Sequence, residues 1–258
     1  MESRVPGTLV AIAALLCFGT TQTIGRVQSS GVEFSYSLPS SITLREPVVV
    51  TATIENRSSG TVTVDLGNHH VQQFAFMLTS PRGVTVSARP QPEEGLYAGP
   101  IVSIEVGQRN AEPTVLNRWL QFDQPGTYEL RIRFLGTVRA IATNTTLDVG
   151  RMFVTNLTVL PRDVEQLKSK CESLAALVAH GTTASERIQA LQQLAYVNDS
   201  VAVPYLRAAV EAGGNPSEAI QGLVRIGGPE ARDAVLALAT SPDRLVAAAA
   251  RNALSRMK

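Results

Sequence analysis

The last third of the chain repeats one spacing of apolar residues: an alanine, an aliphatic residue four positions later and, in two of the copies, another at seven. The three copies begin at Ala190, Ala219 and Ala250, which are 29 and 31 residues apart. A spacing of zero, four and seven places these side chains on one face of a helix. A period near 30 is the length of a helix pair that must bury its apolar face against a neighbouring pair. The sequence therefore predicts stacked helical hairpins, an architecture whose surfaces commonly bind other proteins.

Six helices are expected in this region from apolar periodicity and from residues that favour helix ends. Glu186, Glu218 and Glu230 lie in the expected first turns, where the helix dipole favours an acid, and Gly213 and Gly227 end helices. The expected helices span residues 164–179, 184–197, 201–212, 217–226, 229–239 and 243–257.

Three segments of this region carry a family resemblance. They are Arg187–Leu194 with Val197 and Ala202–Leu206, Ala219–Leu223 with Ile226–Ala231 and Val235–Leu236, and Ala249–Leu254. These residues resemble HEAT repeats, in the short form found in phycobilisome-lyase-like proteins. The resemblance covers residues 187–254 and implies a helical solenoid. The chain departs from the family at the Arg three positions before the repeated Ala, because only Arg187 keeps it.

Between residues 32 and 160 the periodicity changes to two, with Val32, Phe34 and Tyr36 alternating with polar residues. Turns rich in Gly and Pro separate the apolar runs, and the segment has no helical stretch, so the pattern predicts an antiparallel β-sandwich. The expected strands span residues 32–36, 48–54, 62–64, 74–78, 84–86, 101–106, 115–120, 128–134 and 152–159.

The segment Phe122–Leu130 adds detail to this sandwich. It resembles the tyrosine corner of immunoglobulin-like domains, with Tyr128 at the turn before an inner strand. This resemblance implies that the Tyr128 hydroxyl bonds backbone just upstream while the ring packs inward. We expect Trp119, which lies close before the corner, to pair with a neighbouring strand rather than fill the domain centre.

The N-terminus has the pattern of an export signal. Arg4 supplies a positive charge, residues 9–18 form an apolar run, and Gly19, Thr20 and Thr21 offer small residues for cleavage. The run is shorter than the roughly 20 residues that span a bilayer. We therefore expect a signal segment at residues 1–25 and a periplasmic or extracellular protein. Membrane contact is expected only through this segment if it stays uncleaved.

Removal of the signal segment would leave Cys171 as the one cysteine of the chain. A single thiol cannot form an internal disulfide, so the exported regions must depend on their hydrophobic cores. Cys171 lies in an expected helix beside Leu167 and Leu174, and no histidine is near it in sequence. We interpret it as a small buried apolar residue rather than a reactive thiol.

The charge balance argues against a nucleic-acid partner. Residues 31–160 carry ten Arg and eleven acids, and residues 161–258 carry eleven bases and ten acids. Neither part has the basic excess of a protein that binds nucleic acid or an anionic membrane.

No motif for catalysis or cofactor binding is present. The sequence lacks Gly-x-Ser-x-Gly, Gly-x-Gly-x-x-Gly and Walker-type motifs. Adjacent His69 and His70 point to opposite faces of a regular strand and cannot share a metal there. A turn after Asn68 would allow a metal site with Asp65 as a third ligand, but the spacing is not that of known zinc sites. We predict no catalytic residues, no metal and no cofactor.

The segment 88–100 is the candidate binding loop of the sandwich. It holds three Pro and two Gly and is a long connection on a rigid scaffold, where binding residues often lie. A solvated loop without a partner is the alternative. If the sandwich binds a ligand, the first candidates are Glu93, Glu94, Leu96 and Tyr97.

These observations predict an immunoglobulin-like antiparallel β-sandwich at residues 31–160, followed by a short HEAT-like helical solenoid at residues 163–258, with a break at Pro161. The expected function is that of an exported, non-catalytic adaptor that binds protein partners. Two alternatives stay open: an enzyme of bilin-lyase type, and a protease inhibitor or assembly factor that acts through the loop 88–100.

Overall fold

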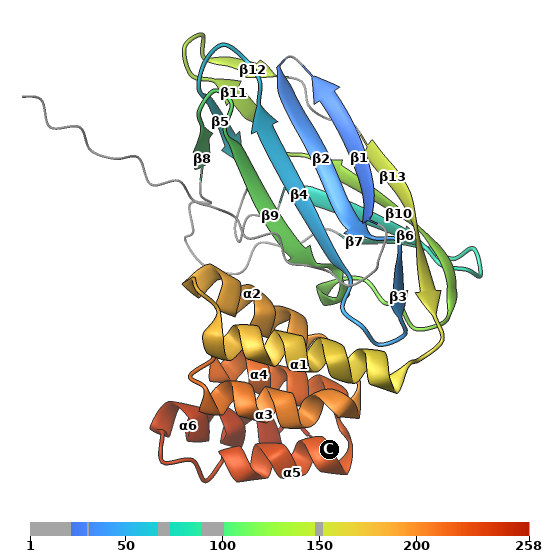
Figure 1. Ribbon diagram of the computed structural model, residues 1–258, viewed down its shortest axis with the longest axis vertical. Coiled ribbons are helices and arrows are strands. Elements are labelled where there is room, and N and C mark those ends of the chain that lie inside the picture. The colour runs from blue at the N-terminus through green and yellow to red at the C-terminus, as the bar shows by residue number, and fades with distance from the viewer. Residues whose placement is uncertain (1–21, 30, 67–72, 89–100, 148–151, 258) are drawn as a thin grey trace, which may run out of the picture.

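In the computed structural model, a β-rich region precedes a helical region (Figure 1). The structure describes residues 22–29, 31–66, 73–88, 101–147 and 152–257. The helical region lies at one end of the sandwich, and α1 and α2 are the helices next to it (Figure 1). This order confirms the predicted fold class.

The first sheet has the strand order β1-β2-β4-β9, with all neighbours antiparallel. Alternate residues of β2 and β4 are buried, as expected for strands with one face on a core. Strand β9 is an edge strand and contains Pro113, which a central strand would not tolerate. The strands are β1 (Gln22–Ser29), β2 (Val32–Pro39), β4 (Val49–Asn56) and β9 (Arg109–Val115).

The second sheet has the order β3-β13-β10-β6-β7. Its pairs are antiparallel except for β3 and β13, which run parallel. The strands are β3 (Ser41–Thr43), β6 (Phe74–Thr79), β7 (Thr85–Ala88), β10 (Gly126–Phe134) and β13 (Met152–Leu160). A small third sheet, of order β12-β11-β5-β8, closes one end and consists of β5 (Val62–Asp65), β8 (Ile101–Ile104), β11 (Val138–Ala140) and β12 (Thr145–Leu147).

Aromatic side chains join the first two sheets across a single core. Phe34 of β2 contacts Phe134 of β10 with ring centroids 5.0 Å apart, and Tyr36 of β2 stacks on Phe153 of β13 at 5.2 Å. Val64 of the third sheet belongs to the same buried cluster. Burial of each large apolar side chain contributes about 1.5–3 kcal/mol, so this core stabilises the sandwich without a disulfide.

The tyrosine corner forms as expected. The Tyr128 hydroxyl donates to the Gln124 carbonyl at 3.1 Å and accepts the Gln124 N–H at 3.3 Å. Its ring is fully buried and packs on Phe122. The corner therefore fixes the turn that leads into β10.

Two predictions about residues 115–120 are wrong: that they form a strand, and that Trp119 pairs with a neighbouring strand. Residues 116–118 form a 3-10 helix rather than part of a strand, because the Asn117 side chain turns back to accept the Val48 N–H at 2.6 Å. Trp119 follows this turn outside the strands, and its ring stacks on Phe76 at 5.8 Å, so it does not pair strands. The sandwich also starts earlier than residue 31, because β1 begins at Gln22 and pairs with β2 along its whole length.

All six expected helices are present, with a short 3-10 turn, Ser200–Ala202, before the third. Helices α1, α3 and α5 form one layer and α2, α4 and α6 form the other (Figure 1). Gly222 of α4 lies against Ala195, where an added Cβ would come to 3.0 Å from the Ala195 backbone, so glycine suits this close helix crossing. The helices are α1 (Val164–His180), α2 (Ala184–Ala195), α3 (Val203–Glu211), α4 (Pro216–Ile226), α5 (Gly228–Leu238) and α6 (Arg244–Leu254).

Polar side chains cap four of these helices. Asp163, Thr183, Asn215 and Asp243 each accept an N–H from the first turn of the helix that follows. Gly213, with a φ of 83°, follows the end of α3, as the sequence predicts. Within the described ranges, no helix has the length and apolar character needed to span a membrane.

Candidate functional site

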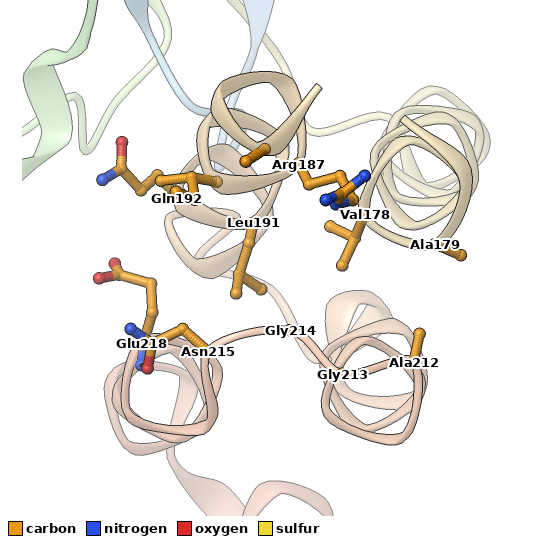
Figure 2. Close-up of a pocket in the computed structure, with 12 residues that line it drawn as sticks. Val178, Ala179, Arg187, Leu191, Gln192, Ala212, Gly213, Gly214, Asn215 and Glu218 are labelled. Carbon is orange, nitrogen blue, oxygen red and sulfur yellow. Dashed lines mark hydrogen bonds between the residues drawn. The ribbon is translucent and has the colours of Figure 1, made fainter. Parts of the chain in front are cut away.

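The helical region carries an open groove where the first two hairpins meet (Figure 2). It encloses about 560 Å³ between the end of α1, the start of α2, the turn after α3 and the start of α4. Apolar residues and glycines form most of its lining, and four polar residues complete it: Val178, Ala179, Ala184, Ile188, Leu191, Ala212, Gly213 and Gly214, with Arg187, Gln192, Asn215 and Glu218.

The floor and the rim of this groove differ in character. Leu191 is buried and points from α2 towards Gly214, which leaves the floor apolar (Figure 2). Ile188, one turn earlier, is 56% exposed. An aliphatic residue this exposed in a concave surface can gain burial when a partner covers it.

Two of the polar residues of the rim are held in place by bonds at helix ends. Arg187 donates from Nη1 to the Gly181 carbonyl at 2.8 Å. Asn215 caps α4 and accepts the Ser217 N–H at 2.9 Å. Polar groups around an apolar floor suit recognition of a segment with both apolar and polar side chains.

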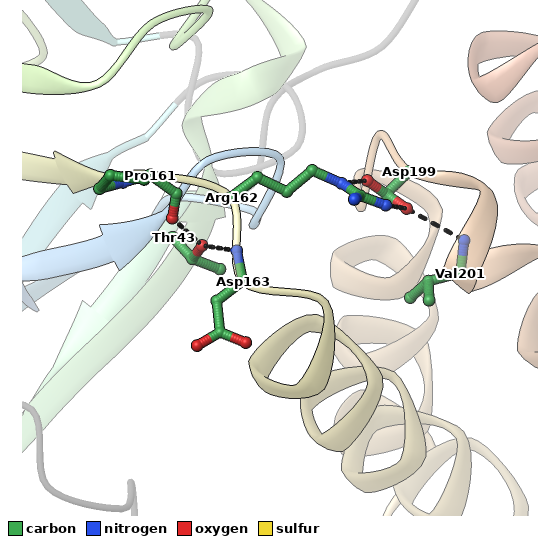
Figure 3. A network of polar contacts seen from close by, with 6 residues as sticks. All are labelled: Thr43, Pro161, Arg162, Asp163, Asp199 and Val201. Carbon is green, nitrogen blue, oxygen red and sulfur yellow. Dashed lines mark hydrogen bonds and ion pairs between the residues drawn. The ribbon is translucent and has the colours of Figure 1, made fainter.

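A second set of contacts fixes the helical region to the sandwich (Figure 3). Thr43 of β3 donates from Oγ1 to the Pro161 carbonyl and accepts the Asp163 N–H, both at 2.8 Å. Arg162 donates from Nε and Nη2 to the two carboxylate oxygens of Asp199 at 2.6 and 3.0 Å. Arg162, in the segment between β13 and α1, is thereby tied to the turn after α2.

Two further bonds cross from the turn after β3 to the helices. The Asn198 N–H donates to the Arg45 carbonyl at 3.1 Å, and Gln166 Nε2 donates to Glu46 Oε2 at 3.2 Å. Burial raises the pKa of Glu46, while the Thr43 N–H bond opposes this effect. The two regions therefore meet through a polar junction with contacts from both sides.

The residues proposed for the candidate binding loop are not among those that the structure describes. Glu93, Glu94, Leu96 and Tyr97 lie outside the described residues, as do His69 and His70. Among the residues that the structure describes, no three His, Cys, Asp or Glu side chains form a group that could hold a metal. No described surface therefore tests the loop prediction.

Cys171 lies in the helical core, as predicted. It is fully buried, and this burial raises its thiol pKa to about 12. Sequence reasoning missed the groove, because its residues come from four elements between residues 178 and 218. The signal in the sequence is Gly213, which predicts a helix end but gives no indication of a groove.

No family model matches the chain, and no curated protein matches it. Among solved structures, it is similar to the putative ApaA protein from Bordetella pertussis at 13% identity and a TM-score of 0.30, over 56% of this chain and 94% of that one. It is also similar to the ASH/PapD-like domain 7 of human CEP192 at 12% identity and a TM-score of 0.30, over 60% of this chain and 100% of that one.

A third similar structure covers more of the chain. Native alpha-2-macroglobulin from Escherichia coli, from domain MG7 to the C-terminus, matches 89% of this chain and 47% of its own, at 11% identity and a TM-score of 0.30. Because the TM-scores of these structures are only 0.30, the architecture of this chain is described from its own structure.

Proposed function

We propose that this protein is an exported, non-catalytic adaptor that binds a protein partner through its helical stack. The immunoglobulin-like sandwich would act as the rigid base, and the stack would be a short HEAT-like solenoid. The repeat spacing of Ala190, Ala219 and Ala250 supports the solenoid, since each of these alanines is buried. The apolar run at residues 9–18 supports export to the periplasm or the cell exterior.

The groove between α1, α2, α3 and α4 carries this proposal. Its floor is formed by buried Leu191 and its wall by exposed Ile188, while Arg187 and Glu218 supply opposite charges at the rim. A peptide segment with an apolar anchor and flanking polar groups would match this lining. Such binding needs no bond to be made or broken, which agrees with the absence of catalytic motifs in the sequence.

A substitution in the groove tests the proposal. Full-length tagged protein would capture a defined partner from an extract of the envelope of its source cells. Ile188→Glu should lose that partner, because a charge would replace the apolar wall. Leu236→Glu is the matched control: Leu236 is 45% exposed on α5, Ile188 is 56% exposed, and only Ile188 lines the groove. Equal capture by both variants, or no partner at all, would contradict the proposal.

The non-catalytic part of the proposal has its own test. An enzyme of bilin-lyase type would change the absorption of an added bilin, and a thiol would be one group able to hold the pigment. Cys171 is buried and its thiol pKa is raised to about 12, so we expect no adduct. A shifted absorption band that stays with the protein after denaturation would reverse this conclusion.

A further inference from the structure

A second hollow lies at the junction of the two regions and is lined by three arginines. It encloses about 410 Å³. Arg45 comes from the turn between β3 and β4, Arg162 from the segment between β13 and α1, and Arg225 from the last turn of α4. Its other lining residues are Asn198, Asp199, Ser200, Ile226 and Gly227. The sandwich and the helical region therefore both contribute positive charge to one space.

The charges in this hollow do not balance. Among the described residues that line it, Asp199 is the one carboxylate and faces three arginines, so the arginines exceed it by two positive charges. Arg162 binds both oxygens of Asp199, and the charge of Arg45 also acts on this carboxylate. The Arg162 bonds lower the pKa of Asp199, so this carboxylate stays charged at neutral pH. Burial lowers the pKa of Arg225, while interactions with Tyr196 and with the Glu218 carboxylate act in the opposite direction and the charge of Arg118 adds to the lowering.

Arg225 is held in place by two contacts. Its guanidinium stacks over the Tyr196 ring, 3.9 Å from the centroid, and Nη2 donates to the Ala195 carbonyl at 2.9 Å. These contacts use one face of the group and one of its five N–H donors. A ligand that binds the remaining donors would cost little further side-chain entropy, because these two contacts already order the side chain.

Arg45 sits in a backbone conformation that arginine rarely adopts. Its φ is 81°, in the left-handed region that favours glycine, and its carbonyl accepts the Asn198 N–H. The turn would form more easily with glycine, so the guanidinium rather than the backbone explains an arginine here. Strained backbone of this kind is often found at functional sites.

We propose that the junction hollow binds an oxyanion, a carboxylate or phosphate group, between the guanidinium groups of Arg45 and Arg225. Guanidinium groups present N–H donors in a planar fork that matches both anions. Since Arg45 belongs to the sandwich and Arg225 to the helical stack, the anion would bridge the two regions. The anion would thus form a second bridge between the two regions, in addition to the ion pair between Asp199 and Arg162.

Isothermal titration calorimetry of the full chain tests this site, with sodium phosphate and, separately, sodium succinate as the ligands. The ionic strength is kept low and constant with sodium chloride. We expect saturable binding of at least one of the two anions. Phosphate alone would identify a phosphate site and succinate alone a carboxylate site, while binding of both would define a general oxyanion site. Absence of saturable binding of either anion would overturn the proposal.

Three variants locate the binding. Arg45→Gly and Arg225→Gln should each weaken it about tenfold, since each removes a charge-assisted contact. Arg207→Gln is the control, because Arg207 lies on α3 and pairs with Glu211 away from the hollow, and it should bind like the unmodified protein. If Arg225→Gln does not fold, Arg45→Gly still decides the matter, because glycine suits its φ. Unchanged affinity in Arg45→Gly, or equal loss in Arg207→Gln, would overturn the site. The titration needs no protein partner, so its result is independent of the groove.

Discussion

Asp199 accepts two hydrogen bonds from the Arg162 guanidinium and a third from the Val201 N–H at 3.1 Å. Asp199 is 8% exposed, while the Arg162 side chain keeps 45% of its surface open. One buried carboxylate thereby fixes the segment that leaves the sandwich and starts the 3-10 turn before α3 (Figure 3). Among the described residues, the buried apolar clusters of the sandwich and of the helices are separate, and directed bonds join the two regions here.

Asp199→Asn should lower the free energy of unfolding by about 2 kcal/mol, because the neutral amide loses the charge-assisted bonds that the carboxylate accepts. Chemical denaturation at pH 7 measures the change. Glu211→Gln is the control, since it breaks the surface pair of Arg207 and Glu211, whose two side chains are 54% and 64% exposed. That variant should unfold like the unmodified protein. A smaller effect for Asp199→Asn than for Glu211→Gln would contradict the role given to the junction.

The contribution of Asp199 should also depend on pH. Hydrogen bonds from Arg162 lower the pKa of Asp199 below the value of about 3.9 that it has in an unfolded chain. The unfolded state therefore takes up a proton first as the pH falls, and the stabilisation is lost. The stability difference between the unmodified protein and Asp199→Asn should be constant above about pH 5 and shrink below about pH 4. A difference that grows on acidification would contradict the assignment.

Arg45→Gly should be more stable than Arg45→Ala by about 1 kcal/mol. Both substitutions remove the guanidinium, but alanine keeps the cost of the left-handed conformation at a φ of 81°, and glycine does not. Thermal unfolding of the two variants at the same pH measures the difference. Equal stability would mean that the turn relaxes to another conformation when the arginine is removed.

Tyr128→Phe should lower the free energy of unfolding by about 1–2 kcal/mol, because the Gln124 N–H and carbonyl lose their partner at the corner while the ring stays packed. Tyr205→Phe is the matched control. Its hydroxyl donates to Glu172 at 3.1 Å in an exposed pair, so its loss should change stability by less than about 0.5 kcal/mol. Denaturant midpoints of both variants test this contrast, and a larger effect at Tyr205 would refute it.

Cys171 should not react with a thiol reagent in the native protein. Burial raises its thiol pKa to about 12 and leaves the residue no exposed surface. Below pH 9 the sulfur therefore forms almost no thiolate, and the reagent cannot reach it. Addition of denaturant should release one reactive thiol from protein that lacks residues 1–21, since Cys17 is then absent. Rapid stoichiometric labelling under native conditions would show that the helical core opens.

The helical region follows from sequence closely because its signals are local. Apolar residues at helical spacing and residues such as Gly213 mark each helix within a few positions. The exceptions are at the ends: residues 200–202 form a 3-10 turn instead of the start of α3, since Asp199 caps that turn. How the hairpins stack, and hence the groove, depends on contacts between helices that no single helix specifies.

The strands are less predictable, because several owe their structure to a neighbour. Strand β9 carries Arg109 and Pro113, lacks apolar alternation and pairs with β4 only as an edge. Strands β3, β11 and β12 have three residues each, too few to show a period. Strand β1 lies partly within the range 1–25 that we expect for the signal segment, and cleavage near Gly19–Thr21 would leave it whole.

The candidate sites were the least predictable part. The arginines of the junction hollow are at positions 45, 162 and 225, so their approach depends on how the sandwich and the stack meet. Residue type alone gave no reason to group them. The strained φ of Arg45 is likewise a property of the folded turn.

The most direct measurement of the proposed function is photo-crosslinking in the source cells. A benzophenone amino acid at position 188 would lie in the wall of the groove, and the same residue at position 236 would lie on α5 outside it. We predict a specific crosslink to one protein partner from position 188 and none from position 236. The same crosslinks from both positions, or none from position 188, would contradict a binding role for the helical groove.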